Sequence, residues 1–385
     1  MLRSKLPESN KTIFSEIKEL AEKNNAVDLA SGLPEAGMPE ILSDLVCKYV
    51  KEGRNQYAPV EGIRELRETI AGFYSEHSEH SARQFDPEKE ITITAGSTQA
   101  VWAAVSAIIH EDDEVIIIEP SYESYIPAVR LNGGTPIFVS LKAPDYHIDW
   151  SETLGMINQR TKMIIINTPH SPTGSVFTDD DYKNLQKIVA GSKIVVLCDE
   201  TFANLTYEKP YVGISKYPLL AKQTVIISSF SKSLNATGWK TGYCIAPEDY
   251  TKEIRRIHNY MINGSNSIMQ YALAELLKTD DTVFDTVRDE YRRKRDFLCS
   301  LLEGSKYKLT PTKGTWFQTV DFSQVSSLSD KEFVLKLIKE YNVAVYPLSA
   351  YYHDKTKSHT IRICFARPDD VIKKGVECLL KAQKS

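Results

Sequence analysis

The sequence has few cysteines for its length, and none of them form a close pair. The six cysteines of the 385-residue chain are Cys47, Cys198, Cys244, Cys299, Cys364 and Cys378. Their spacing excludes a CxxC metal or redox site and argues against a disulfide framework. The only tight histidine cluster, His77 and His80, lies in the polar stretch SEHSEHSARQ. We expect a solvated helix end or loop there rather than a metal site, so no metal is predicted.

The sequence also lacks a membrane span, a signal-peptide core and an excess of positive charge. No apolar run approaches the ~20 residues that cross a bilayer, and the start of the chain, MLRSKLPESNK, has no apolar core. With 47 basic and 51 acidic residues, the net charge of -4 provides no positive field for a nucleic acid. We find neither GxxxxGK[ST] nor GxGxxG, which weakens nucleotide-binding interpretations. We therefore expect a cytoplasmic protein that binds neither membranes nor nucleic acids.

Short β-branched runs alternate with longer amphipathic stretches between about residues 90 and 260, which is typical of βαβ units. The expected strands are 91–94, 114–119, 135–141, 162–167, 193–199, 224–229 and 242–246. Several lack in/out alternation, so helices should cover both faces of the sheet. The predicted fold is α/β, with a seven-stranded, mainly parallel sheet and a smaller α+β domain. We expect an N-terminal segment (1–50) packed on the small domain, a large domain (51–280) and a small C-terminal domain (281–385).

Ligands of open α/β sheets bind beyond the carboxyl ends of the strands, where this sequence carries unusual polar residues. After the first strand, Gly96, Ser97, Thr98 and Gln99 precede a helix, whose free backbone N–H groups suit a phosphate. Taken alone, such a segment is more often a plain helix N-cap. The loop NTPHSPTG (167–174) by itself indicates only a rigid turn.

Two further strand ends carry charged residues. Asp199 ends a strand that should be buried, where an unpaired carboxylate needs a cationic partner. A helix cap or an internal salt bridge would also satisfy it. Lys232 follows the strand 224–229, and Lys240 lies in a Gly-flanked turn beyond it. A lysine in a partly desolvated pocket can form a Schiff base, although a surface lysine is the commoner outcome.

Together these four strand ends match the needs of one cofactor, pyridoxal phosphate. They supply a phosphate cradle, a lysine for an imine, an acid to pair with a cation and a rigid loop. The cofactor's ring nitrogen must stay protonated to act as an electron sink. A carboxylate ~4 Å away at an effective dielectric of ~20 supplies ~4 kcal/mol, or about three pKa units. This favours Asp199 as the partner of the ring nitrogen.

The sequence resembles the fold-type I pyridoxal-phosphate aminotransferases of class I/II over nearly its whole length. It looks closest to their branch of methionine aminotransferases and kynurenine aminotransferases (glutamine transaminase K). The resemblance rests on NQYAPVEGIRELRE, TAGSTQA, EPSYESY, NTPHSPTG, CDET, SSFSKSLNATGWKTGYC and IRICFA. Several such motifs in the right order are specific for this family.

The resemblance implies a role for each matching position. Lys232 would form the imine and, once released, move a proton between the substrate α-carbon and the cofactor, whose ring nitrogen Asp199 would pair with. Arg362 would bind the substrate α-carboxylate as a bidentate pair, with Gly32 lining the same pocket. Outside the family, an arginine in such a strand could equally be an exposed charge. The cofactor ring and phosphate would be held by Tyr122, Ser97, Thr98, Gln99, Ser229 and Lys240, and by Tyr57 from the other subunit of a homodimer.

The sequence departs from the family pattern at two positions. Where the family's loop usually has an asparagine that bonds the cofactor's phenolate oxygen and lies near the substrate carboxylate, this chain has Ser171. Where the family usually has a tyrosine that bonds the same oxygen, this chain has Phe202. Serine is shorter and phenylalanine cannot donate a hydrogen bond. We therefore expect a less stabilised phenolate and a higher pKa for the imine between the cofactor and Lys232.

The sequence indicates the substrate class less directly. One arginine is assigned to the α-carboxylate, and no second one can be placed for a side-chain carboxylate. Segments that border the site in relatives carry Ile13, Phe14, Trp316, Phe317, Tyr351 and Tyr352. Ordinary core packing is the alternative for these aromatic residues. We expect a ping-pong aminotransferase for neutral L-amino acids of the methionine, aromatic, kynurenine or glutamine type, acting with a 2-oxo acid. A cysteine-S-conjugate β-lyase and a catalytically weakened or regulatory cofactor-binding protein remain as alternatives.

Overall fold

The computed structural model describes residues 4–6, 13–77, 80–280, 282–354 and 357–384. Its main feature is a seven-stranded sheet of order β2-β8-β7-β6-β5-β3-β4, in which β8 runs antiparallel to both of its neighbours and the other pairings are parallel. The strands are β2 (Ile91–Thr94), β3 (Glu114–Glu119), β4 (Thr135–Ser140), β5 (Thr161–Asn167), β6 (Val195–Asp199), β7 (Thr224–Ser229) and β8 (Gly242–Ile245). All seven predicted strands are confirmed to within two residues.

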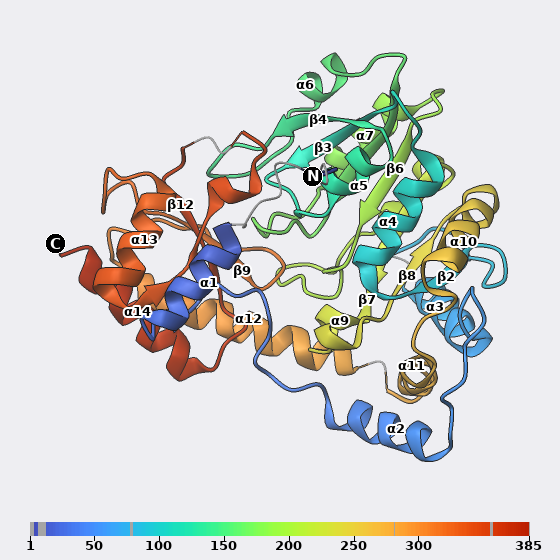
Figure 1. Ribbon diagram of the computed structural model, residues 1–385, viewed down its shortest axis with the longest axis horizontal. Coiled ribbons are helices and arrows are strands. Elements are labelled where there is room, and N and C mark those ends of the chain that lie inside the picture. The colour runs from blue at the N-terminus through green and yellow to red at the C-terminus, as the bar shows by residue number, and fades with distance from the viewer. Residues whose placement is uncertain (1–3, 7–12, 78–79, 281, 355–356, 385) are drawn as a thin grey trace.

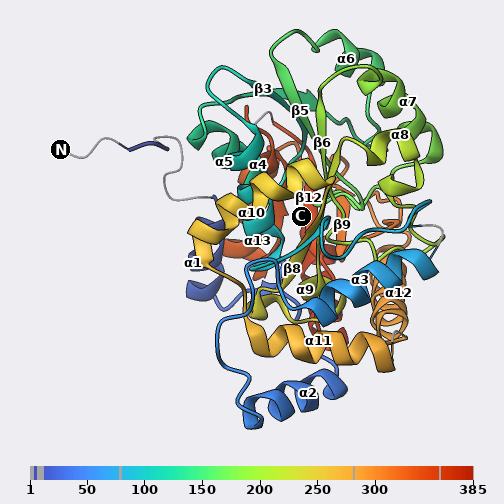
Figure 2. The same ribbon diagram turned by 90° about the vertical axis from the view of Figure 1, so that its right-hand side faces the viewer.

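Helices cover both faces of this sheet, as the uninterrupted apolar runs predicted. Along β3, Ile116 and Ile118 belong to one buried cluster, whereas Val115 and Ile117 belong to the cluster on the opposite face. Figure 2 shows α4, α5 and α10 on one side of the strands and α7 and α8 on the other. The helices of this region are α3 (Arg64–Glu76), α4 (Gly96–Ile108), α5 (Tyr125–Leu131), α6 (Trp150–Gly155), α7 (Asp179–Val189), η1 (Ile214–Lys216), α8 (Pro218–Ala221), α9 (Phe230–Ser233), η2 (Thr237–Trp239), α10 (Glu248–Ile262) and α11 (Ser267–Thr279).

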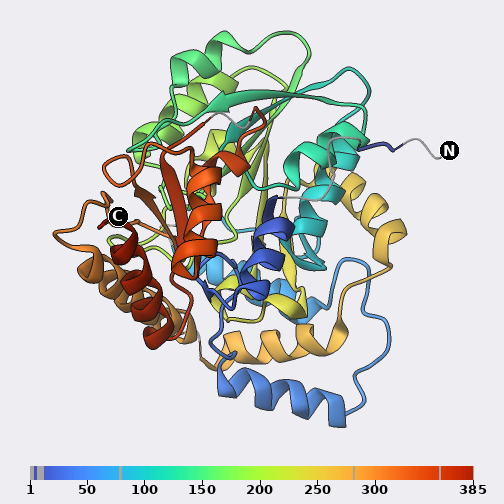
Figure 3. The same cartoon turned by 60° about the vertical axis from the view of Figure 1, so that its left-hand side comes forward.

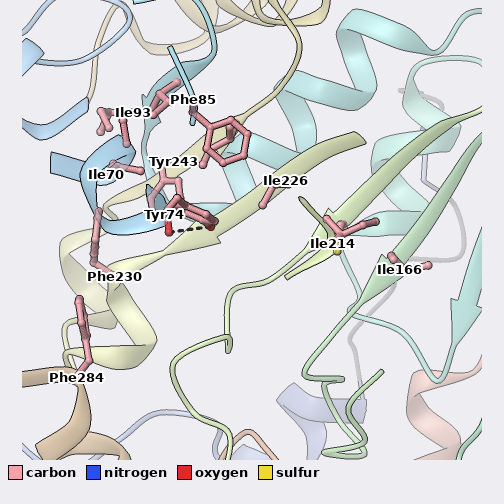
Figure 4. Close-up of a cluster of buried hydrophobic side chains, with 14 of the residues drawn as sticks. Ile70, Tyr74, Phe85, Ile93, Ile166, Ile214, Ile226, Phe230, Tyr243 and Phe284 are labelled. Carbon is pink, nitrogen blue, oxygen red and sulfur yellow. Dashed lines mark hydrogen bonds between the residues drawn. The ribbon is translucent and has the colours of Figure 1, made fainter. Parts of the chain in front are cut away.

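The larger of the two clusters joins the sheet to α3 and to the segment after α11. Figure 4 shows part of it, with Tyr74 of α3 and Tyr243 of β8 in hydrogen-bond contact at 3.4 Å. His80 packs against the Tyr74 ring and is only 7% exposed, so the expectation of a solvated histidine pair is wrong at this position. In the described part of the chain, no group of histidine, cysteine or acidic side chains has the arrangement of a metal site. No helix described there is long and apolar enough to cross a membrane.

A second, smaller sheet lies in the C-terminal part of the chain. Three antiparallel strands have the order β11-β12-β9, and β1 pairs with β10 in parallel. Figure 3 shows the blue helix α1 beside the orange helix α13, which it contacts. The elements are α1 (Ile13–Lys23), β1 (Val27–Asp28), α12 (Val283–Leu302), β9 (Phe317–Asp321), α13 (Asp330–Tyr341), β10 (Val343–Ala344), β11 (Tyr346–Pro347), η3 (Leu348–Tyr351), β12 (Thr360–Cys364) and α14 (Asp369–Ala382).

The N-terminal segment is divided between the two parts of the molecule. Helix α2 (Glu40–Lys51) packs on α11, far from α13 and α14, and its Leu42 and Val46 join the cluster of the large sheet. The expectation that all of residues 1–50 pack on the C-terminal part is therefore wrong for α2. The link between α1 and α2 crosses the region where the two sheets meet, which is where the predicted site residues lie.

Candidate active site

A cavity of about 400 Å³ lies where the carboxyl ends of the large sheet's strands face the small sheet. It is lined by eleven of the thirteen residues to which the resemblance assigns a cofactor or carboxylate role, the exceptions being Gln99 and Tyr57. These lining residues are Gly32, Ser97, Thr98, Tyr122, Ser171, Asp199, Phe202, Ser229, Lys232, Lys240 and Arg362. Residues separated by more than 300 positions in the sequence thus meet in one pocket.

Lys232 enters the cavity from α9, which begins directly after β7. Ser229 caps this short helix, because its hydroxyl accepts a hydrogen bond from the N–H of Ser231 at 3.1 Å. The Lys232 amine lies 5.0 Å from the centre of the Trp316 ring and 5.7 Å from that of Phe202. Burial and, second to it, the charge of Lys240 lower the pKa of the Lys232 amine to about 8. The neutral, nucleophilic fraction of this amine near neutral pH is therefore much larger than that of an ordinary lysine.

Asp199 ends β6 and is only 6% exposed. The Tyr125 hydroxyl donates to its Oδ2 at 2.7 Å, and the Thr201 N–H donates to its Oδ1 at 3.0 Å. Burial raises the pKa of the Asp199 carboxyl, although these donors and the Lys232 charge act in the opposite direction. A buried carboxylate of this kind is stabilised by a cationic partner in the cavity.

An anion cradle lies at the first turn of α4. Ala95, the residue before the helix, provides no side-chain cap, so the first N–H groups of α4 are available to a ligand. Ser97 and Thr98 line the cavity at this turn, and the Thr98 hydroxyl contacts the Tyr122 hydroxyl at 3.0 Å. A Cβ at position 96 would lie 3.3 Å from Cε of Lys240, so the absence of a side chain at Gly96 lets that cation lie close to the turn. Backbone N–H groups, hydroxyls and an ammonium group together suit a phosphate.

The loop after β5 is held rigidly against Asp199. The Asn167 amide donates to the backbone carbonyl of Asp199 at 2.8 Å, and its Oδ1 accepts from the N–H of Ser171 at 2.7 Å. His170 is buried in the same loop, and burial lowers the pKa of its imidazole to about 4. The backbone of Ser171 is thus fixed at the cavity wall.

Arg362 enters the cavity from β12 of the small sheet. Its Nη1 donates to the Tyr351 hydroxyl at 2.7 Å, and its Nη2 donates to the Ala30 carbonyl. The guanidinium lies 4.1 Å from the centre of the Phe317 ring and 4.8 Å from that of Tyr346. Nε of Arg362 is buried and has no partner among the described residues. An oriented guanidinium with a free buried donor is suited to a carboxylate.

Gly32 also lies near this arginine, two residues after Ala30 in the segment that links α1 and α2. A Cβ at position 32 would lie 3.3 Å from Cζ of Phe317 and 3.8 Å from Nη1 of Arg362. A larger residue would therefore intrude on the carboxylate site. Of the six residues expected to border the substrate, Phe14, Phe317 and Tyr351 line the cavity, whereas Ile13, Trp316 and Tyr352 do not.

The structure adds lining residues that the sequence reasoning missed. They are Leu33, Glu123, Tyr125, Asn167, Thr201, Ser231, Thr237 and Tyr346. Tyr125 and Asn167 lie in the quoted motifs EPSYESY and NTPHSPTG, so these motifs could have indicated them as site residues. Thr237 likewise lies in the quoted motif SSFSKSLNATGWKTGYC, whereas Leu33 and Tyr346 are placed only by the tertiary fold.

Two of the residues with a predicted cofactor contact lie outside the cavity. The Gln99 side chain is turned toward α10, where its Oε1 contacts Nδ1 of His258 at 3.2 Å. Its expected contact with the cofactor stays a prediction. Tyr57 is 83% exposed on the surface of the single chain, so its expected contact across a dimer stays a prediction.

Comparison with known proteins identifies the family. The sequence profile of aminotransferase class I and II matches residues 20–379, and the chain belongs to this family. It is 37% identical to the methionine aminotransferase of Escherichia coli strain K12 over 378 residues, which cover 98% of this chain and 97% of the relative. It is 27% identical over 401 residues to human kynurenine–oxoglutarate transaminase 1, covering 95% of this chain and 94% of that one.

The fold agrees with that assignment. The crystal structure of YbdL from Escherichia coli, for which a methionine aminotransferase function was identified, superposes with a TM-score of 0.95 and covers 99% of both chains. The chain is thus an aminotransferase of the fold-type I architecture. Enzymes of class I and II use pyridoxal phosphate, and the donor set of the cavity fits that cofactor: a buried amine, a buried carboxylate and an anion cradle.

Proposed function

We propose that this chain transfers the amino group of a neutral L-amino acid of the methionine, aromatic, kynurenine or glutamine type to a 2-oxo acid by a ping-pong mechanism. The observation that carries the proposal is the placement of the cations in the cavity. Among the described residues that line it, only Lys232, Lys240 and Arg362 are basic, and Lys232 and Lys240 lie at the cofactor end. Arg362 is then the single cation for the substrate, which suits an α-carboxylate and leaves none for a side-chain carboxylate.

The residues at the cofactor end have distinct tasks in this proposal. The Lys232 amine would hold the cofactor through its aldehyde, and Asp199 would keep the ring nitrogen protonated. Ser97, Thr98, Ser229 and Lys240 would bind the phosphate, and Tyr122 would pack on the ring. When bound, pyridoxal phosphate would supply an electron sink that makes the substrate α-proton acidic. The Lys232 amine would move that proton, because its lowered pKa lets it accept and return a proton near neutral pH.

The substrate end favours apolar and aromatic side chains. Arg362 fixes the α-carboxylate, and Gly32 leaves room for it. Phe14, Leu33 and Tyr346 line the cavity next to this cation. Glu123 adds a carboxylate to the same wall, and this charge disfavours an acidic substrate. The 37% identical methionine aminotransferase supports a substrate of this class.

We also propose that the enzyme acts as a homodimer in which Tyr57 reaches the cofactor phosphate of the partner subunit. Large apolar side chains are exposed next to the cavity: Leu33 lines it, and Trp239 precedes Lys240. Met261 contacts Gln99 at the start of α4 and is 39% exposed. Exposed apolar surface of this kind is typical of an interface. Sedimentation should give twice the chain mass of 43.5 kDa, and a fully active monomer would contradict this proposal.

The function is tested by recording the visible spectrum while single amino acids are added. Methionine and aromatic amino acids should bleach the cofactor band at lower concentrations than aspartate or glutamate. A 2-oxo acid should then restore the band, and the products should be a matched pair of oxo acid and amino acid. Pyruvate and ammonia from a cysteine S-conjugate would instead indicate the β-lyase. This alternative stays open because Ser171 and Phe202 both depart from the family pattern. Retained colour without any spectral change would indicate a non-catalytic cofactor-binding protein.

A further inference from the structure

The orientation of Arg362 depends on Tyr351. The Tyr351 hydroxyl accepts a hydrogen bond from Nη1 of Arg362 at 2.7 Å, and the two side chains come from different elements, η3 and β12. Phe14 packs against the Tyr351 ring with centroids 5.0 Å apart. Because the guanidinium must present its free Nε to a carboxylate, a displacement of η3 would misalign it.

Residues 351–353 form a continuous set of hydrogen bonds to the large sheet. The Tyr351 carbonyl accepts from the N–H of Ser121 at 2.9 Å, and the Tyr352 hydroxyl donates to the Leu141 carbonyl at 2.8 Å. The backbone N–H of His353 donates to Oε2 of Glu119 at 2.9 Å, and its Nδ1 contacts Oε1 of Glu119 at 2.9 Å. The segment after η3 is thus fixed to the ends of β3 and β4.

Glu119 is the centre of this attachment. Its side chain is completely buried at the end of β3, and the Ser140 hydroxyl also donates to it at 3.0 Å. The His353 ring stacks on Phe138 with centroids 3.8 Å apart and an interplanar angle of 5°. A buried carboxylate needs such donors, and a stacked imidazole provides one in a fixed orientation. The pair therefore holds residue 353 in one position relative to β3.

The segment after β3 also carries Tyr122, the residue expected to pack on the cofactor ring. Tyr122 follows Glu119 by three residues, and Ser121 between them bonds to Tyr351. From this geometry we infer that Glu119 and His353 are positioning residues that set the orientation of Arg362 relative to Tyr122, through Tyr351. Neither residue lines the cavity, so neither touches the substrate. The inference rests on the proposed role of Arg362 in binding the α-carboxylate.

The test is a double-mutant cycle on the cofactor-loaded enzyme. The readouts are KM and kcat for methionine and the Kd of 3-phenylpropanoate, a monocarboxylate without an amino group, measured by its effect on the visible band. His353→Ala should raise KM and this Kd about tenfold while kcat and cofactor affinity change little. His353→Asn should restore most of the loss, because its amide nitrogen can donate from the position of Nδ1. His110→Ala removes the exposed His110–Asp113 pair at a distant site and should change nothing.

The cycle separates failure of the inference from failure of the proposed function. Arg362→Lys should weaken 3-phenylpropanoate binding, and His353→Ala should add little in that background, because its effect passes through Arg362. If Arg362→Lys leaves the Kd unchanged, the proposed carboxylate site is wrong. If Arg362→Lys weakens binding but His353→Ala does not, or if the two losses multiply independently, the positioning role is wrong. A His353→Ala loss that Asn does not restore and that extends to cofactor affinity would also overturn it.

Discussion

The Lys232 amine lies 5.7 Å from the centre of the Phe202 ring, on the side of the cavity where relatives usually have a tyrosine hydroxyl. The Phe202 ring is perpendicular to the Trp316 ring, with centroids 5.2 Å apart, and both rings are buried. The surroundings of the amine at this wall are therefore apolar. A phenolate oxygen on a cofactor bonded to Lys232 would receive no hydrogen bond from position 202.

Phe202→Tyr should lower the pH at which the visible band of the cofactor-bound protein changes. The added hydroxyl can donate to the phenolate and stabilise the deprotonated form, which is worth about one pKa unit. A pH titration of the absorption band measures this directly. Phe202→Leu, which removes the ring without adding a donor, should keep the pKa of the parent enzyme. An unchanged or higher pKa in the tyrosine variant would refute this explanation.

Glu200 should make the protein less stable as the pH rises. Its side chain is completely buried beside Asp199, and burial raises the pKa of its carboxyl to about 7 from 4.5. The folded state therefore binds more protons than the unfolded state between about pH 4.5 and 7, and stability falls across this window. Glu200→Gln removes the titration and keeps an acceptor for the Ile214 N–H, which bonds to Oε1 at 3.0 Å.

We expect the Glu200→Gln variant to gain about 2–3 kcal/mol relative to the parent enzyme between pH 5 and pH 8. Thermal unfolding at the two pH values measures the change as a difference in Tm. Glu111→Gln, an exposed change of the same chemistry, serves as the control and should show no pH-dependent difference. Equal Tm differences at pH 5 and pH 8 for Glu200→Gln would show that the buried carboxyl does not titrate in this window.

Cofactor capture should accelerate with pH up to about 8 and then level off. The neutral form of Lys232 attacks the aldehyde, and burial lowers the pKa of this amine to about 8. The rate at which the visible band forms after cofactor-free protein is mixed with pyridoxal phosphate reports the neutral fraction. A free lysine side chain reacting under the same conditions should continue to accelerate toward pH ~10. If the protein does so as well, the amine is not desolvated as the structure indicates.

The sequence predicted the large sheet well because its strands are short apolar runs that end in polar residues. β3 and β7 begin and end where the apolar pattern does. The spacing of apolar residues in α2 indicates that one face of this helix is buried, but it does not identify α11 as the helix against which that face packs. The short strands of the small sheets are harder to predict: the apolar run VAVYP contains two strands, β10 and β11, because the chain changes pairing partner at Val345.

The site was predicted where a motif lies directly at a strand end, as for Lys232 and Asp199. The prediction for Gln99 came from its neighbours in sequence, but successive residues on a helix point in different directions, and position 99 faces α10. The hydrogen bond from the Tyr125 hydroxyl to Asp199 was not predicted, because the contact between α5 and the end of β6 depends on how whole elements pack in the folded chain. Glu119 and His353 were missed for the same reason, since they are 234 residues apart.

The central claim is that the side chain of Lys232 is bonded to the cofactor. Borohydride reduction of the cofactor-saturated enzyme, followed by mass spectrometry of its peptides, tests this claim most directly. We predict one reduced pyridoxyl group per chain, located on Lys232, and none on the corresponding peptide of a Lys232→Ala variant. A label on any other lysine of the parent enzyme, or an unlabelled Lys232 peptide, would contradict the assignment of this cavity as the active site.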